Sequence, residues 1–171
     1  MRSFHPIYNP LMALKVLQLI LIEYPDAILY MGGVDLGYKK ETENTVKEMG
    51  LSKSVIFPGF QDIQGKNHLA SLCDIYMCTN RIDNTPVTLL EMMALGLPIV
   101  TTNVGGIPYM IKNNEALLVD SENPQQMANA ILKILNDPSY SISMIDRGRN
   151  LVKAYDEEMV ANKWINLLES L

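Results

Sequence analysis

Two acidic residues that could bind or act on a ligand, Asp83 and Glu91, lie eight positions apart in the stretch Asp83-Asn-Thr-Pro-Val-Thr-Leu-Leu-Glu91. Thr85-Pro86 between them is a helix-start signal, and an apolar run follows it. A helix N-terminus attracts phosphate, and a carboxylate accepts hydrogen bonds from neighbouring hydroxyl groups. The spacing therefore predicts a site for a phosphorylated sugar. An ordinary helix cap followed by a solvated glutamate is the alternative that the spacing alone leaves open.

Glycine pairs follow two of the apolar runs, at Gly32-Gly33 and at Gly105-Gly106. Glycine lets a ligand approach the backbone closely. Neither pair forms a G-x-G-x-x-G fingerprint, and a tight turn explains each of them equally well.

Short apolar runs alternate with helical patterns along the chain. The runs predict strands at residues 27–31, 54–57, 74–78, 98–102 and 116–119, and the helical patterns predict helices at 10–22, 37–49, 68–72, 86–95, 124–135, 141–155 and 156–171. This alternation is typical of an α/β domain with one doubly wound parallel sheet. In such folds ligands bind beyond the carboxyl ends of the strands, where the acids and the glycine pairs fall.

The composition narrows the class of protein. The chain has 171 residues, 48% of them hydrophobic, which suits one globular domain. Its net charge of −5 argues against a nucleic-acid partner and against an anionic membrane surface as the main target. Cys73 and Cys78 lack metal-ligand spacing, so they are expected to be core thiols in a reducing compartment. The apolar stretch at 11–22 is interrupted by Lys15 and Gln18, which favours an amphipathic helix over a membrane span.

A longer pattern surrounds the two acids. It runs from Asp83 through Glu91-Met-Met-Ala-Leu-Gly-Leu-Pro-Ile-Val to Val104-Gly-Gly-Ile-Pro108, and further matching pieces are Tyr24-Pro-Asp-Ala27, Val55-Ile-Phe-Pro-Gly59 and Cys73-Asp-Ile-Tyr-Met77. The combination resembles the signature of the group 1 (family 4) glycosyltransferases. The resemblance covers about nine-tenths of the chain, and its pieces together are more specific than any one alone.

The resemblance implies a GT-B fold, in which two Rossmann-like domains enclose the active site. Residues 1–171 match only the C-terminal, donor-binding domain, so we expect a fragment of a two-domain protein whose N-terminal acceptor domain lies outside it. The implied reaction transfers a sugar from a UDP-, GDP- or ADP-sugar to a glycan or lipid-linked acceptor. It retains anomeric configuration and needs no metal or other cofactor. The implied location is the cytoplasm, at the inner membrane surface where the acceptor half makes contact.

The resemblance also assigns roles to individual residues. Asp83 and Arg2 match the catalytic positions: Asp83 contacts the transferred sugar and Arg2 neutralises the leaving diphosphate. Glu91 matches the acid that holds the ribose. The backbone N–H groups of Asn84, Thr85 and Val87 are expected to bind the diphosphate. Gly33 is expected to lie beside the donor. Gly59, Phe60 and Gln61 are expected to lie next to the base.

Departures from the family pattern leave alternatives open. Ile7 stands where a lysine usually follows the arginine, so Lys66 or Arg81 would have to supply that charge. Asp83 replaces the usual glutamate and is one methylene shorter. These changes keep open a non-catalytic nucleotide-binding or interaction module with a degenerate pocket. A sugar-nucleotide epimerase or phosphorylase relative is a further alternative, although the histidine or lysine pattern it requires is not seen. In relatives the final helix packs on the N-terminal domain. In this fragment its apolar face, around Trp164, is expected to be exposed, to fold back on its own domain or to support self-association.

Overall fold

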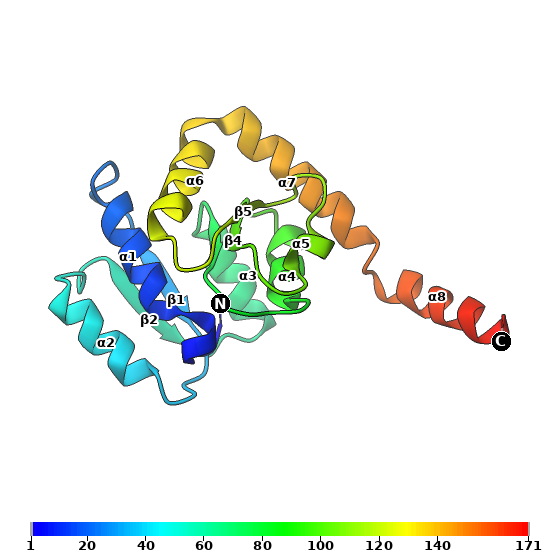
Figure 1. Ribbon diagram of the computed structural model, residues 1–171, viewed down its shortest axis with the longest axis horizontal. Coiled ribbons are helices and arrows are strands. Elements are labelled where there is room, and N and C mark those ends of the chain that lie inside the picture. The colour runs from blue at the N-terminus through cyan, green and yellow to red at the C-terminus, as the bar shows by residue number, and fades with distance from the viewer. Residues whose placement is uncertain (1, 171) are drawn as a thin grey trace.

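The computed structural model describes residues 2–170 and shows alternating strands and helices (Figure 1). The strands are β1 (Leu29–Gly32), β2 (Val55–Gly59), β3 (Tyr76–Cys78), β4 (Ile99–Thr102) and β5 (Leu117–Val119). The helices are η1 (Pro6–Tyr8), α1 (Pro10–Ile20), α2 (Lys39–Glu48), α3 (Ile63–Ser71), α4 (Val87–Ala94), α5 (Ile107–Met110), α6 (Pro124–Asn136), α7 (Pro138–Lys153) and α8 (Glu157–Glu169).

All five predicted strands form, and every pair of neighbours is parallel. The α/β fold class is therefore confirmed. The hydrogen-bonded ladders make two sheets among residues 2–170, one of order β1-β2 and one of order β3-β4-β5. The sheet that the alternation predicts as continuous is thus interrupted between β1 and β3.

Helices cover both faces of the strands, as a parallel sheet requires. In β4, Ile99 and Val100 are both fully buried and point to opposite faces. Ile99 packs with Leu89 and other side chains of α4, whereas Val100 packs with Met127 and other side chains of α1 and α6. A third cluster, around Leu14, fills the space between α1, α2 and β2.

Local signals explain where most helices begin. Asn9 caps α1 by accepting a hydrogen bond from the Met12 N–H, and Pro10 follows in the first turn. The predicted helix at 68–72 begins earlier, at Ile63, because the Asp62 carboxylate caps it through the Gly65 N–H at 2.8 Å. The short helices η1 and α5 were not predicted, since each is too brief to show a periodic pattern.

Helix α8 extends away from the rest of the molecule (Figure 1). Its apolar side chains are exposed, with Trp164 at 61% and Leu168 at 64%. Across residues 2–170, no helix combines the length and apolar character needed to cross a bilayer.

Candidate functional site

The candidate site lies where the strands end, in loops that hydrogen bonds tie together. The Gly33 N–H donates to the Gly59 carbonyl at 2.9 Å, which links the ends of β1 and β2. The Gly106 N–H donates to the Asp83 carbonyl at 2.9 Å, which links the loops after β3 and β4. A Cβ at Gly106 would collide with the Asn84 carbonyl. The glycine at 106 is therefore needed to bring the loop that carries Asp83 and Asn84 into place.

Arg2 and Asp83, the two expected catalytic residues, form an ion pair. Their side chains are only 21% and 15% exposed, so solvent screens the pair weakly. The Arg2 guanidinium also lies over the Tyr8 ring, 4.6 Å from its centroid, in a cation–π contact. The Nε atom of Arg2 is buried and has no hydrogen-bond partner among the described residues.

Asn80 positions Asp83 through a side-chain hydrogen bond, a role that the sequence did not reveal. Its side chain is fully buried, and its amide Nδ2 donates to Asp83 Oδ2 at 2.7 Å. The Thr102 hydroxyl donates to the Asn80 carbonyl at 2.6 Å, so the end of β4 positions this residue in turn. The available signal was a polar side chain directly after an apolar strand, which marks the ligand-facing edge of such a sheet.

Glu91 and Lys66 form the second charged pair of the site. Lys66 Nζ lies 2.6 Å from Glu91 Oε1, and the side chains are 26% and 33% exposed. The other carboxylate oxygen, Oε2, is buried and lacks a partner within residues 2–170. Buried polar atoms normally have a hydrogen-bond partner. An acceptor atom in this position suits a hydroxyl group of a ligand.

Tyr76 is buried within the electrostatic reach of both Arg2 and Glu91. Burial raises the pKa of its hydroxyl, and weaker opposing influences come from Arg2, which lowers this pKa, and from Glu91, which raises it. The side chain acts on neither pair as a charge, because its proton stays in place at neutral pH.

Helix α4 begins beside these pairs, one residue later than predicted. Pro86 holds the N-cap position with ψ of 105°, and no side chain caps the helix, so the prediction of Thr85 as the cap is wrong. The extended backbone of Pro86 keeps it outside the helix. Asn84, Thr85 and Val87 are exposed around this uncapped end, where the helix dipole favours an anion.

The loop after β2 carries the residues expected near a base. The Phe60 side chain is 71% exposed, so its ring is open to a stacking partner. The Gln61 side-chain amide instead donates to the carbonyls of Pro58 and Phe60, each at 2.9 Å. Gln61 thus stiffens this loop.

Arg81 is not brought to the site. Its Nε lies 2.5 Å from Glu122 Oε1, and its Nη1 donates to the Pro6 carbonyl at 2.5 Å. The hydrogen bond from Arg81 holds the pKa of Glu122 below its usual value, with help from Asn9. Of the two cations suggested as replacements for the lysine at position 7, only Lys66 lies beside a site acid. Within the part of the chain that the structure describes, no cluster of His, Cys, Asp and Glu has an arrangement suited to a metal ion.

Comparison with known proteins gives a family match over almost the entire chain. The family described as glycosyl transferases group 1 matches residues 1–169. An uncharacterized glycosyltransferase of Haemophilus influenzae is 28% identical over 91% of this chain and 44% of its own length. The D-inositol 3-phosphate glycosyltransferase of Corynebacterium urealyticum is 26% identical over 95% of this chain and 40% of its own length. The chain therefore spans less than half the length of these relatives.

Solved structures show the same fold. The C-terminal domain of a glycosyl transferase group 1 family protein (LpcC) from Francisella tularensis matches with a TM-score of 0.78 and 26% identity, covering 90% of this chain and 82% of that one. Anabaena Alr3699/HepE, solved in complex with UDP and glucose, matches with a TM-score of 0.86 and 20% identity, covering 99% of this chain and 48% of that one. The match to the Francisella domain agrees with the prediction of a C-terminal Rossmann-like fold.

Proposed function

Since this chain belongs to the group 1 glycosyltransferases, we propose that residues 1–171 form the donor-binding half of a retaining enzyme that uses a nucleoside-diphosphate sugar. The buried, unpartnered Oε2 of Glu91 carries this proposal. Lys66 neutralises the carboxylate through Oε1 and leaves Oε2 to accept hydrogen bonds. A ribose offers neighbouring hydroxyl groups as donors, so it suits this acceptor.

The diphosphate is assigned to the surface between Arg2 and the start of α4. Arg2 provides a fixed positive charge, and the uncapped N-terminus of α4 adds the dipole of the helix. Both are in place before charge builds on the leaving diphosphate, so they stabilise it without reorganisation. Asp83, held by Arg2 and Asn80, is assigned to hydroxyl groups of the transferred sugar.

Lys66 is proposed to replace the lysine that the family usually has at position 7. Its partnership with Glu91 places a second cation near the donor. A degenerate binding module offers no reason for a buried carboxylate oxygen to be left without a partner. This observation favours a nucleotide site over an interaction module that binds no nucleotide.

The finer features of the reaction belong to the same proposal. The transferred group is a hexose, no metal is required, and the acceptor is a glycan or lipid-linked saccharide bound by a second domain. Residues 1–171 alone would then bind donor but transfer nothing. The Anabaena protein of the same fold was solved with UDP and glucose, which makes UDP the first ligand to test, followed by GDP and ADP.

The test is calorimetric titration of the chain with UDP and with 2′,3′-dideoxy-UDP, repeated for GDP and ADP. We expect the nucleotide with both ribose hydroxyls to bind at least about tenfold more tightly, because a hydrogen bond to a charged acceptor contributes about 1.5–3 kcal/mol. Glu91→Gln should abolish that difference. Glu48→Gln, the same change on the exposed surface of α2, is the matched control and should preserve it.

Two results would contradict the proposal. If no nucleoside diphosphate binds at millimolar concentration, residues 1–171 are not a donor site. If a nucleotide binds but Glu91→Gln keeps the ribose preference, the ribose contact has been assigned to the wrong residue.

A further inference from the structure

Arg2 supplies the fixed positive charge of the proposed donor site, so its function depends on how its side chain is held. Its backbone is anchored at the end of β1, where the Arg2 N–H donates to the Gly32 carbonyl at 3.0 Å. A long arginine side chain has many rotamers, and the guanidinium therefore needs contacts of its own. Asp83 is one of them. The buried Nε atom of Arg2 makes no hydrogen bond within residues 2–170.

The ring of Tyr8 is the second contact of this guanidinium. The Cζ atom of Arg2 lies 4.6 Å from the ring centroid, within the range of a cation–π interaction. An aromatic ring attracts a cation through its quadrupole and carries no net charge. Asp83, in contrast, carries a full negative charge that offsets the charge of Arg2. Tyr8 is thus the contact that can hold the guanidinium and leave its charge available to an anion.

The loop after β3 fixes Tyr8 in its turn. The hydroxyl of Thr79, a buried residue, lies within hydrogen-bond distance of the carbonyls of Tyr8 and Asn9, at 2.8 and 3.0 Å. The Arg81 N–H donates to the Ile7 carbonyl at 2.8 Å. These contacts bind η1 to the same loop that leads to the first acid of the site. The ring therefore has a defined position relative to the residues that Arg2 must reach.

We propose that Tyr8 is a positioning residue of the donor site, which holds the Arg2 guanidinium where it meets the diphosphate of the nucleotide. This inference rests on the proposed function, in which Arg2 binds the diphosphate. Tyr8 acts through Arg2 and has no need to touch the nucleotide. Without the ring, the guanidinium keeps only its contact with Asp83, and it must be ordered again each time a nucleotide binds.

The experiment replaces Tyr8 by leucine, which removes the aromatic face, and by phenylalanine, which keeps it. Calorimetric titration measures the affinity for UDP, and ligand-observed NMR measures the affinity for uridine, which has the base and ribose without the phosphates. GDP with guanosine, or ADP with adenosine, takes their place if the wild type prefers that base. We expect Tyr8→Leu to weaken UDP binding about three- to tenfold and to leave uridine binding unchanged. Tyr8→Phe should stay within about twofold of the wild type.

A second cation–π pair offers a matched control. Lys133 Nζ lies 4.5 Å from the centroid of the Tyr140 ring, and these residues belong to α6 and α7. Tyr140→Leu makes the same chemical change away from the strand ends, so it should leave the affinity for UDP unchanged.

The double variant Arg2→Ala/Tyr8→Leu separates positioning from support of the fold. It should bind UDP no more weakly than Arg2→Ala alone, because Tyr8 acts through Arg2. Thermal unfolding tests the same contact without a nucleotide. Tyr8→Leu should lower Tm by roughly 2 °C more in the wild type than in the Arg2→Ala background.

Three results would overturn this inference alone, in a wild type that binds a nucleoside diphosphate. The first is an unchanged affinity for UDP in Tyr8→Leu. The second is an equal loss in Tyr8→Phe, since the hydroxyl would then be responsible. The third is an equal effect of Tyr8→Leu, on affinity or on Tm, with and without Arg2. If the wild type binds no nucleoside diphosphate, the proposed function fails and this inference fails with it.

Discussion

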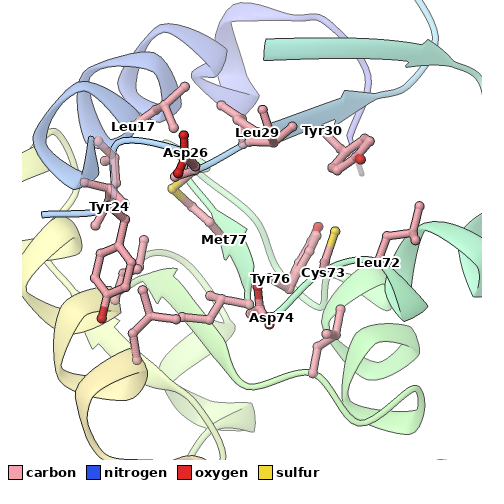
Figure 2. A pocket seen from close by; sticks show the side chains of 18 of the residues that line it. Leu17, Tyr24, Asp26, Leu29, Tyr30, Leu72, Cys73, Asp74, Tyr76 and Met77 are labelled. Atoms are coloured by element: carbon pink, nitrogen blue, oxygen red, sulfur yellow. The ribbon is translucent and has the colours of Figure 1, made fainter. Parts of the chain in front are cut away.

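The gap between β1 and β3 differs sharply between its two ends. At the carboxyl end, residues 2–4 pair with the backbone beyond β1, and Arg2 reaches Asp83 in the loop after β3. At the amino end the same two strands enclose a cavity of about 780 Å³ (Figure 2). The gap is thus bridged at the end where the residues proposed to bind the donor lie.

This difference shows how the candidate site is stabilised. Asp83 is held by Arg2 and Asn80, and the loop that carries it packs against Gly105 and Gly106. These contacts are local to the strand ends. They do not require a ladder between β1 and β3, because charges and loop hydrogen bonds connect the two sheets there.

The largest expected effect compares the filled core around α4 with the cavity between β1 and β3. Leu89 of α4 is fully buried in the core, whereas Leu29 of β1 is partly buried and lines the cavity. Leu89→Ala should destabilise the protein by about 2–5 kcal/mol, because it opens a new void in a filled core. Leu29→Ala should destabilise the protein by only about 1 kcal/mol. The variant loses the transfer free energy of the removed carbons, which are partly exposed, but little new cavity forms.

Urea denaturation of both variants would measure this contrast. The same substitution at both positions keeps the chemistry matched. If the two losses are equal, the region between β1 and β3 is packed as well as the core under α4, and the contrast between the two ends is wrong.

An intermediate effect concerns the charged link at the carboxyl end. A double-mutant cycle with Arg2→Ala and Asp83→Asn should give a coupling energy of about 1–2 kcal/mol, because the two side chains are in contact and mostly buried. The surface pair of Lys39 and Glu43 on α2, 3.5 Å apart and more exposed, is the control. Its coupling should be below about 0.5 kcal/mol.

The same variants connect stability with binding. Arg2→Ala should also weaken the binding of nucleoside diphosphate, since the proposed phosphate site loses its fixed cation. A coupling near zero between Arg2 and Asp83 would mean that the pair does not hold the two sheets together at this end.

The smallest effect is expected at Glu122, beside the site. The hydrogen bond from Arg81 lowers the pKa of Glu122, so the folded state binds this proton more weakly than the unfolded state. The resulting stability is present above the ordinary carboxyl pKa and is lost as the pH falls through the folded-state pKa. Because the side chain is 55% exposed, the change in Tm is expected to be roughly 1 °C.

Thermal unfolding of wild type and Glu122→Gln between pH 6 and pH 3 would check this prediction. The wild type should have the higher Tm at pH 6, and the difference should disappear by pH 3. A difference that persists at pH 3 would indicate that Glu122 acts through something other than its charge.

The sequence predicted the strands and most helices of this fold because burial leaves a strong pattern. Five short apolar runs separated by helical periods became five parallel strands. The start of α4 was placed one residue early, since Thr85-Pro86 resembles a capped helix start while Pro86 is extended in the structure. The interruption between β1 and β3 leaves no pattern, because pairing depends on neighbours that are distant along the chain.

The candidate site was predictable only in part. The family pattern predicted Arg2, Asp83 and Glu91 as site residues, and the structure brings the first two together. It did not identify Asn80, because a single asparagine after a strand is a common turn residue. It offered Lys66 or Arg81 as the second cation and placed only Lys66 among the donor-binding residues. Only the tertiary structure shows that Lys66 of α3 lies beside Glu91 of α4, whereas Arg81 pairs with Glu122.

The sequence by itself determined the class of fold and the family, because periodicity and short-range motifs are local properties of the chain. The tertiary structure alone decided which charges meet, which carboxylate oxygen lacks a partner, and where the two sheets remain apart. The physical reason is that these features depend on distances between residues far apart along the chain, such as Arg2 and Asp83. The packing of several elements at once decides such distances, and no single segment encodes them.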